Sequence, residues 1–551
     1  MTFREATRDS WWLTALVLVC VAAAWLRLQQ FAAQVLLDDE WHALHTLFRH
    51  DPLDIALSFG RFDHSIPLTL TYQAMTGTAG LDEMLMRLPS LVAGLATILV
   101  GVLWTWRRLG PPTAVVFGWL LAISPLLVVY SRAARSYAPV VLLLLIAFWA
   151  AHAWWDRRGS GYLWLYAICA ALGTWLHPLF GPLFLTPLLF FALDGIRQAG
   201  RPRLPFPVLK RLLAGGLAVA LLTAPLVLPP LIADPAAIFD KAGAGEFPAH
   251  TLPEVAHLMA GTSHAAILWL FVVLFVAGTA LLLQRTPRHL AFGALVVLVL
   301  AATLAVSRPA WMSTGYVMAR YMIVLLPGML LAVALAITTI AARASASPPV
   351  RALLIGVFCV LLALGNPVRE ILQRPVSHSL HPYFIADARP EARRMNRFLE
   401  QMPQSRFWTD HGPLLDDARS ALALAPWRFE APLSPLPVLE RRTGRRVIPA
   451  FINGYCAVVN FGEPPPDSGV RLRNAVHLAR GEAGAGKAGY LVWVRRWHID
   501  PEGEKTLAAM GLYTDPLFLH YPDCEPQFTS VFGKPVYSDP WLAVFRLPGT
   551  I

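Results

Sequence analysis

The sequence predicts an α-helical multi-pass membrane protein that carries a C-terminal domain outside the bilayer. Hydrophobic residues make up 56% of the 551 residues and charged residues only 15%, beyond the norms of soluble proteins. Long apolar runs recur and are separated by arginine-rich connections. These runs stop near residue 366, where Pro, Asp, Glu and Arg become more frequent. We therefore expect a membrane domain over 1–366 and a soluble domain over 367–551.

Eleven apolar runs, each expected to form a membrane helix, account for the membrane domain. The first carries Arg27 and leads into acidic residues instead of a small-residue cleavage site, so we expect a retained span and not a cleaved signal peptide. The expected spans are 11–35, 87–106, 112–130, 137–155, 161–176, 180–195, 211–232, 264–284, 289–306, 320–341 and 351–366.

The connections between the spans predict the orientation of the chain. If the N-terminus is cytoplasmic, every cytoplasmic connection is basic, and the segment "DGIRQAGRPRLPFPVLKR" is the densest. The opposite connections include the acid-bearing residues 38–64. An odd number of spans then leaves the C-terminal domain outside. We expect an integral protein of the inner (cell) membrane whose active site and C-terminal domain face the periplasm or exterior.

The connection over 38–86 is expected to be an external loop with helices that lie along the membrane surface. Its apolar piece "IPLTLTYQAMTG" is too short to cross about 30 Å of hydrocarbon. The segment "EWHALHTLF" places Trp41, Leu44 and Phe48 on one helical face, which is typical of an interfacial helix.

The C-terminal domain is expected to be a small α/β or α+β domain. Strand-like pieces ("RRVIPAFI", "GYLVWVRRW", "WLAVFRL") follow the helical segment "ARPEARRMNRFLEQM". An oxidising compartment would permit a disulfide between its Cys456 and Cys524. The other three cysteines lie in apolar runs and are expected to be core side chains.

Two features that suggest nucleotide or nucleic-acid binding have simpler explanations. The net charge of +11 comes largely from arginines that flank apolar runs, where the positive-inside rule accounts for them, so we expect no nucleic-acid partner. The segment "GEAGAGKA" has the spacing of a P-loop but carries Ala488 where a hydroxyl must hold magnesium. We interpret it as a turn.

Three acids in a row, Asp38, Asp39 and Glu40, follow the first apolar run. One acid suffices to cap a helix N-terminus, and no basic side chain within the motif neutralises the other two. A metal site is a competing hypothesis, because Asp38, His42 and His45 share one helical face. The motif HExxH is absent and histidines are common at the water line, so we favour acid–base chemistry without a metal.

The segment "VVYSRAARSYAP" carries the second candidate group. Arg132 and Arg135 are three residues apart and are expected to project from one side of a helix. Long arginine stems reach headgroups readily, which is the competing explanation. The hydroxyl-bearing residues on either side of the two arginines favour a phosphate site, since guanidinium binds phosphate bidentately and stays charged. The framing residues are Tyr130, Ser131, Ser136 and Tyr137.

Further polar residues are expected at the same membrane boundary. They are His64, His177, Arg320 and Tyr321. Each alone is typical of an interface anchor. Their shared side of the membrane indicates a functional site, because ionisable groups at this depth are costly.

With these motifs in place, the chain resembles the polyprenyl-phosphate-sugar-dependent glycosyltransferases of the GT-C superfamily. The nearest groups are the protein O-mannosyltransferase-like family and the aminoarabinose transferases of lipid A. The resemblance covers about residues 10 to 366. Its motifs occur in order: "DDEWHAL", "HSIPLTL", "MRLPSLVAGL", "YSRAARSYA", "LHPLFGP" and "ARYMIVLLPG".

The resemblance implies roles for four residues. Asp39 matches the general base of the family, with Glu40 beside it, and Arg132 and Arg135 match the arginines that hold the lipid phosphate. We expect Tyr137, His177, Arg320 and Tyr321 to bind substrate in the same cavity.

The sequence departs from the family at three points. Asp38 adds an acid before the pair, so either Asp38 or Asp39 is the base, and Asp38 is also a candidate substrate ligand. His64 stands where the aminoarabinose transferases have a lysine. Ser136 and Pro139 occupy the region of a second acid used by those enzymes, which leaves the sugar undefined.

The expected reaction is an inverting transfer of a sugar from a polyprenyl-phosphate donor to an acceptor hydroxyl of a lipid, glycan or protein. The carboxylate removes the hydroxyl proton, and the arginines stabilise charge on the departing phosphate, so no cofactor is expected. A lipid-linked-glycan flippase or other transporter is the alternative, although the charges cluster at one membrane edge and not at mid-bilayer. A scaffold that works through its C-terminal domain is a third.

Overall fold

The computed structural model contains two compact units, which we describe separately. The first comprises Met1–Leu28, His42–Gln73 and Arg87–Val368, and the second Gln29–Trp41, Ala74–Met86 and Arg369–Ile551. The residues that the structure describes are 3–29, 31, 40, 43, 46–47, 50–59, 65–76, 78, 81, 83–156, 159–200, 204–239, 243, 251–309, 315–368, 405–407, 421–425, 447–449, 488–495 and 524–547.

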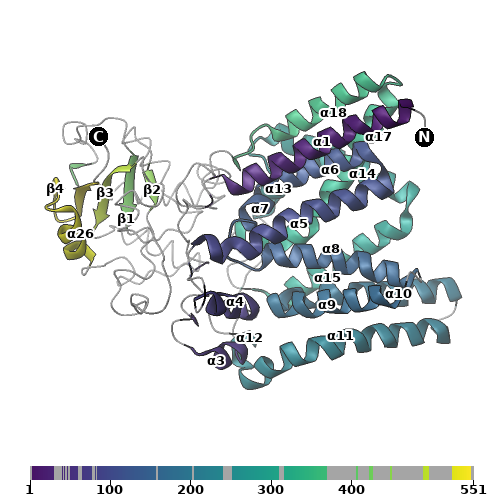
Figure 1. Cartoon of the computed structure of the whole chain (residues 1–551), viewed down its shortest axis with the longest axis horizontal. Coiled ribbons are helices and arrows are strands. Elements are labelled where there is room, and N and C mark those ends of the chain that lie inside the picture. The colour runs from purple at the N-terminus through teal and green to yellow at the C-terminus, as the bar shows by residue number, and fades with distance from the viewer. Residues whose placement is uncertain are drawn as a thin grey trace. The chain divides into compact units, whose positions relative to one another are not determined.

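The first unit is a bundle of apolar helices (Figure 1). Among the described residues, 8 helices are long and apolar enough to cross a membrane. They are α1 (Phe3–Leu28), α5 (Glu83–Leu109), α8 (Tyr137–Trp155), α10 (Gly181–Ala199, preceded by the 3-10 turn η1, Pro178–Phe180), α11 (Phe206–Ala233), α14 (Ala265–Arg285), α15 (Pro287–Ser307) and the segment formed by α16 (Gly315–Met322), η3 (Ile323–Leu325) and α17 (Leu326–Ala344).

Three shorter apolar helices complete the match to the predicted spans. They are α6 (Pro111–Ile123), α9 (Ser160–Leu176) and α18 (Pro348–Ala363). Each of the eleven predicted runs therefore coincides with a helix, which confirms the helical membrane fold. The third run was expected to be one helix, but it is divided into α6 and α7 (Pro125–Tyr130). Proline lacks an amide hydrogen and clashes with the preceding turn, so Pro125 breaks the helix.

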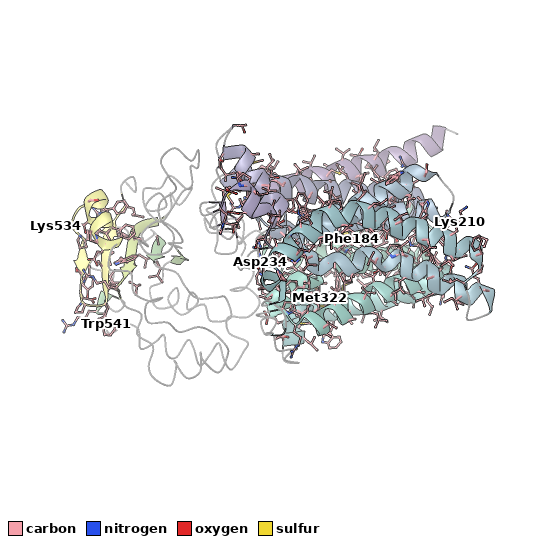
Figure 2. The ribbon with its side chains drawn as sticks, turned by 90° about the horizontal axis from the view of Figure 1, so that it is seen from below. Phe184, Lys210, Asp234, Met322, Lys534 and Trp541 are labelled. Atoms are coloured by element: carbon pink, nitrogen blue, oxygen red, sulfur yellow. The ribbon has the colours of Figure 1, made fainter. Side chains whose placement is uncertain are left out.

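The two ends of the bundle differ in what they carry. Figure 2 shows Asp234 and Met322 at one end and Lys210 at the other, and we call these the Asp234 end and the Lys210 end. The short connecting helices α3 (Pro52–Ala56), α4 (Ile66–Thr76) and α12 (Ala236–Phe239) lie at the Asp234 end (Figure 1), and α13 (Leu252–Ala260) precedes α14. The segment "IPLTLTYQAMTG" forms the 11-residue helix α4, and its expected position along the membrane surface stays a prediction.

The loop at the Asp234 end is fixed to the helices by packing and hydrogen bonds. Phe59, Ile66 and Ala237 are buried together, and Trp175 of α9 packs against them. Ser58 donates a hydrogen bond to the Asp234 carboxylate at 2.5 Å. Residues 58–59 and 66 are thus held against the ends of α9 and α11.

The C-terminal unit contains a mixed sheet with the order β2-β1-β3-β5-β4. β1 (Ala421–Ala425) is parallel to β2 (Val447–Pro449) and β3 (Ala488–Val494), whereas β5 (Leu542–Arg546) is antiparallel to β3 and β4 (Tyr537–Ser538). Three strands coincide with the predicted strand-like pieces, and α26 (Cys524–Phe532) follows β3 in the chain, so the α/β or α+β class is confirmed. The expected helix "ARPEARRMNRFLEQM", Cys456 and the Cys524 side chain lie outside the description.

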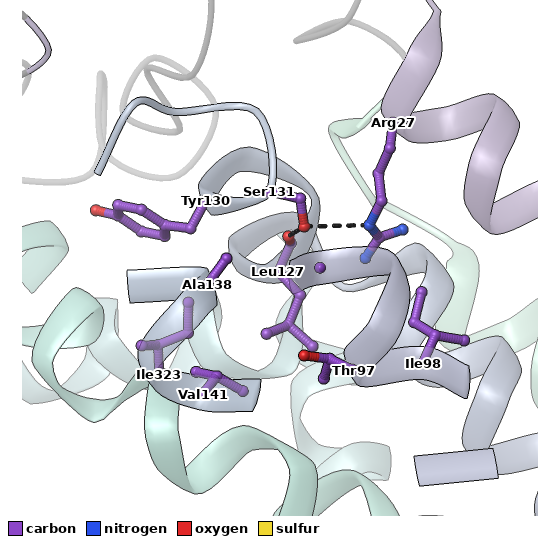
Figure 3. A pocket seen from close by; sticks show the side chains of 10 residues that line it. Arg27, Thr97, Ile98, Leu127, Tyr130, Ser131, Ala138, Val141 and Ile323 are labelled. Atoms are coloured by element: carbon purple, nitrogen blue, oxygen red, sulfur yellow. Dashed lines mark hydrogen bonds between the residues drawn. The ribbon is translucent and has the colours of Figure 1, made fainter. Parts of the chain in front are cut away.

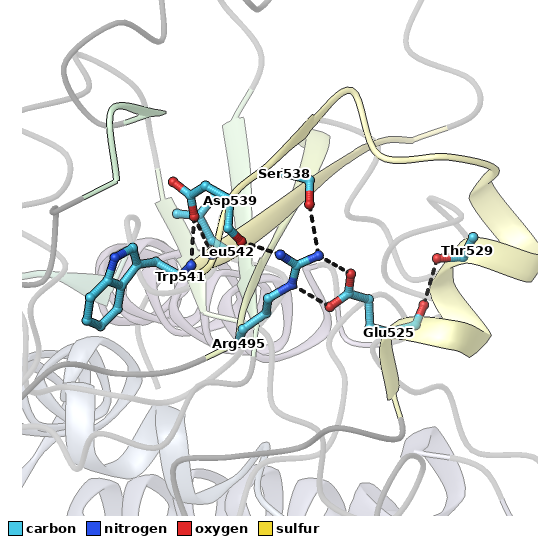
Figure 4. A network of polar contacts seen from close by, with 7 residues as sticks. All are labelled: Arg495, Glu525, Thr529, Ser538, Asp539, Trp541 and Leu542. Atoms are coloured by element: carbon cyan, nitrogen blue, oxygen red, sulfur yellow. Dashed lines mark hydrogen bonds and ion pairs between the residues drawn. The ribbon is translucent and has the colours of Figure 1, made fainter.

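A half-buried arginine at the end of β3 ties this sheet to its helix (Figure 4). Arg495, at the end of β3, donates to both carboxylate oxygens of Glu525, to Ser538 Oγ at 2.8 Å, and to the Asp539 carbonyl. The hydrogen bond with Glu525 raises the pKa of Arg495 above its usual value. The network fixes α26 and the β4–β5 turn on the end of β3.

Close backbone packing between α14 and α17 predicts a sharp penalty for adding one methyl group. A Cβ at Gly278 would lie 1.9 Å from the Ala332 carbonyl oxygen, whereas one at Gly293 on α15 would meet nothing within 4 Å. We expect Gly278→Ala to lower the free energy of unfolding by about 1–3 kcal/mol. Gly293→Ala should change it by less than about 0.5 kcal/mol.

Thermal unfolding of the purified protein in detergent measures both variants. Equal melting temperatures for Gly278→Ala and Gly293→Ala would contradict the close contact between α14 and α17.

Candidate functional site

The two predicted phosphate-binding arginines lie in a buried non-helical segment. We call Ser131–Ser136 the arginine turn, because α7 ends at Tyr130 and α8 begins at Tyr137. The expectation that Arg132 and Arg135 project from one side of a helix is therefore wrong. Their exposed fractions are only 2% and 8%. The backbone folds tightly here, with the Arg135 amide donating to the Ala133 carbonyl at 2.8 Å.

Helices α1 and α5 hold the arginine turn from two sides. Arg27 of α1 donates from Nε to Ser131 Oγ at 3.1 Å (Figure 3). Arg132 donates back to the Arg27 carbonyl at 2.6 Å. Ser90 of α5 donates to the Arg135 carbonyl at 2.9 Å. The cavity beside Ser131 measures about 10 Å³, roughly the space of one water molecule. The turn is therefore closely packed.

An aromatic cluster adjoins the arginine turn. We use this name for Tyr130, Tyr137, His177, Phe180, Tyr316 and Tyr321, which come from α7, α8, the α9–η1 junction and α16. The ring centroids of Tyr137 and His177 are 5.4 Å apart, and those of Tyr137 and Tyr321 are 6.4 Å apart. These side chains are far apart in sequence, and the helix ends bring them together.

Arg320 places a further buried guanidinium beside this cluster. Its Cζ lies 5.8 Å from the ring centroid of Tyr137 and 5.3 Å from that of Tyr321. Aromatic faces attract a cation and restrict its orientation. Four of the predicted substrate-binding residues, Tyr137, His177, Arg320 and Tyr321, are thus adjacent in space.

The acidic motif is only partly described. Glu40 is fully buried and belongs to the second unit. Asp38, Asp39 and His64 lie outside the described residues, as do the side chains of the alternative metal ligands His42 and His45. The position next to His64 is fixed, because Ser65 donates to the Leu176 carbonyl at 3.0 Å, one residue before His177.

Two charged residues of this region were not among the predicted site residues. Arg27 is only 1% exposed, and an arginine inside an apolar run is a signal that could have identified it. Glu254 of α13 is 7% exposed. A Cβ at Gly315 would lie 2.3 Å from the Glu254 carboxyl carbon, so this acid lies against the start of α16, where a helix N-terminus favours negative charge.

Residues 63–227 match the family model of dolichyl-phosphate-mannose-protein mannosyltransferases. That range contains the arginine turn and His177. No curated protein matches the sequence. The match covers less than a third of the chain, and it lies in the part where the motifs predict a resemblance to lipid-phosphate-dependent glycosyltransferases.

The chain is similar to several solved structures at low sequence identity. The crystal structure of ArnT from Cupriavidus metallidurans in the apo state is 13% identical, with 98% of this chain and 99% of that chain covered and a TM-score of 0.49. The oligosaccharyltransferase AglB from Archaeoglobus fulgidus, in complex with an inhibitory peptide and a dolichol-phosphate, is 11% identical, with 88% and 70% covered and a TM-score of 0.46. The arabinofuranosyltransferase AftD from Mycobacteria is 15% identical, with 89% and 37% covered and a TM-score of 0.43.

The contact between α5 and the arginine turn predicts a local effect of a glycine substitution. A Cβ at Gly94 would lie 2.1 Å from Ser131 Oγ and 2.6 Å from Ser131 Cβ. We expect Gly94→Ala to displace the turn and to increase hydrogen exchange in peptides that cover 131–136, because displaced backbone loses its hydrogen bonds.

Gly101→Ala on the same helix is the control, since its Cβ would approach the side chains of Phe117 (3.0 Å) and Leu121 (3.3 Å) and no atom of the arginine turn within 3.6 Å. Unchanged exchange over 131–136 in Gly94→Ala would show that α5 does not position the turn.

Proposed function

We propose that the chain is an inverting glycosyltransferase that moves a sugar from a polyprenyl-phosphate donor to an acceptor hydroxyl. The observation that carries this proposal is the burial of Arg132, Arg135 and Arg320 at one end of an apolar bundle. Three guanidiniums gathered at one helix-end region make it strongly positive, and guanidinium matches the geometry of phosphate. The matching family is itself named for a dolichyl-phosphate-linked donor.

The donor phosphate would bind to the arginine turn. Arg132 and Arg135 would share charge with its oxygens, and these interactions strengthen as the glycosidic bond breaks and charge grows on the leaving phosphate. The rings of Tyr137 and Tyr321 orient Arg320 next to this position. The apolar helices provide the surface along which the polyprenyl chain extends.

Asp39 would act as the general base, with Glu40 beside it. A carboxylate with a pKa near ~3.9 is ionised at neutral pH and can accept the proton of an acceptor hydroxyl. The oxygen then forms a bond to the anomeric carbon from the face opposite the lipid phosphate, and the phosphate departs with the bonding electrons. Asp38, His64 and His177 would contact the substrates.

The distribution of arginines supports an orientation of the chain in the inner membrane. Arginines gather where helices end or begin at the Lys210 end, including Arg107, Arg108, Arg197, Arg285 and Arg343. Positive residues favour the cytoplasmic side, so the Asp234 end and the C-terminal domain would face the periplasm or exterior. The acceptor would be a lipid, glycan or protein of the cell envelope.

Replacement of the base tests the reaction directly. Asp39→Asn removes the proton acceptor with little change in shape, so sugar transfer should fall by about 10²–10⁴-fold. Asp54→Asn, which neutralises an exposed carboxylate on α3, is the control and should retain most of the activity. Mass spectrometry of envelope glycans and glycolipids from cells that produce each variant measures the transfer. If the Asp39→Asn variant folds and product levels stay normal, Asp39 is excluded as the general base.

A binding experiment tests the phosphate site separately. Arg135→Gln deletes a buried charge, and we expect the affinity for undecaprenyl phosphate to fall about tenfold or more. Lys210→Gln removes an exposed charge at the opposite end and should leave the affinity unchanged. Titration of the purified protein with this lipid supplies both dissociation constants. Equal losses in the two variants would exclude a specific phosphate site at the arginine turn.

A further inference from the structure

A break in the third span leaves three backbone carbonyls in need of partners. Helix α6 ends at Ile123, and the Leu121 carbonyl would normally accept from the amide of residue 125, which is a proline. Hydrocarbon offers no water to replace that bond. Side chains supply it: Arg27 donates to the carbonyls of Leu121 (3.2 Å) and Ala122 (3.1 Å), and Asn366 donates to that of Ile123 (2.8 Å).

Arg27 differs from Asn366 because it also contacts the arginine turn. Its Nε donates to Ser131 Oγ at 3.1 Å, while Nη1 also donates to the Ala23 carbonyl at 3.2 Å. In return, Arg132 donates to the Arg27 carbonyl at 2.6 Å, which is one of the carbonyls that the end of α1 leaves without a helical partner. Arg27 therefore caps the end of α6, and Arg132 caps the end of α1.

This reciprocal capping fixes the arginine turn with directional bonds. Four hydrogen bonds hold the Arg27 guanidinium in one orientation, and its side chain is almost completely enclosed. Ser131, held by Arg27 and by its own bond to the Leu127 carbonyl at 2.5 Å, directly precedes Arg132. A rotation of the Arg27 head would move the backbone from which Arg132 projects.

We propose that Arg27 is a positioning residue for donor binding: it holds the arginine turn in the geometry that receives the lipid phosphate. The inference rests on the proposed function and assigns a role to a residue outside the phosphate site. A purely structural cap would contribute only to stability. A positioning residue also changes the affinity for the donor lipid.

Four variants separate these roles. Arg27→Gln removes the fork that joins α6 to Ser131, and Arg27→Lys keeps the charge but loses the fixed geometry. Ser131→Ala deletes only the contact with the turn. Asn366→Ala is the matched control, because it uncaps the same end of α6 without touching the turn. Each purified full-length variant is titrated with undecaprenyl phosphate, and its melting temperature is recorded.

We expect Arg27→Gln to weaken lipid binding about tenfold and Ser131→Ala by a smaller factor. The affinity of Arg27→Lys for the lipid should lie between those of Arg27→Gln and the wild type. The double variant Arg27→Gln/Ser131→Ala should bind no worse than Arg27→Gln, since both act through one contact. Asn366→Ala should lower the melting temperature and leave the affinity unchanged. If Arg27→Gln does not fold, the affinities of Ser131→Ala and Arg27→Lys are compared with that of Asn366→Ala instead.

Two results would overturn the inference: an affinity in Arg27→Gln and Ser131→Ala equal to that of the wild type, or an equal loss of affinity in Asn366→Ala. Failure of the wild-type protein to bind the lipid is a different outcome, because it contradicts the proposed function. Hydrogen exchange over 131–136 then tests the positioning role alone, which requires faster exchange in Ser131→Ala than in Asn366→Ala.

Discussion

The interruption of a membrane helix at Ser124–Pro125 is the constraint on which the described site depends. An unsatisfied carbonyl inside a bilayer costs several kcal/mol, so a broken helix there must be capped by protein groups. Arg27 and Asn366 supply the caps. The remaining part of the span, α7, is short, and the chain then turns through Ser131–Ser136 before α8 begins. The break thus creates both the need for a buried arginine and the turn that carries two more.

The two ends of the bundle use charged side chains differently. At the Lys210 end the charges have structural partners: Arg288 pairs with Asp194 at 3.1 Å, and Arg211 donates to the carbonyls of Trp154 and Trp155. At the Asp234 end, buried arginines lie with an aromatic cluster built from several helix ends. Such a concentration of guanidiniums and ring faces favours the proposed recognition of a lipid phosphate.

The sequence predicts the membrane spans and the C-terminal strands well, because both leave strong local patterns. An apolar run of adequate length has few alternatives to a membrane helix, and β3 is a nearly continuous buried run between polar segments. Polar and aromatic residues at the ends of apolar runs can also be recognised in the sequence itself. For this reason Tyr137, His177, Arg320 and Tyr321 could be named from the sequence, and the structure brings them together.

The geometry of the arginine turn could not be predicted in the same way. The spacing of Arg132 and Arg135 suggests a helical face, but whether a helix continues after Pro125 depends on partners elsewhere in the chain. Ser131 and Arg27 are 104 positions apart, and Asn366 and Ile123 are 243 apart. Gly94 appears as an ordinary helix residue until α5 is packed against Ser131. Contacts between residues so far apart in the chain leave no pattern in the local sequence.

The most direct test is an experimental structure of the full chain with undecaprenyl phosphate bound in a lipid nanodisc. Our account predicts the phosphate oxygens within hydrogen-bond distance of the Arg132 and Arg135 guanidiniums, with the Arg27–Ser131 contact intact and the Asp39 carboxylate in the same hollow. A lipid phosphate at the Lys210 end, or an Asp39 directed away from the bound headgroup, would contradict it.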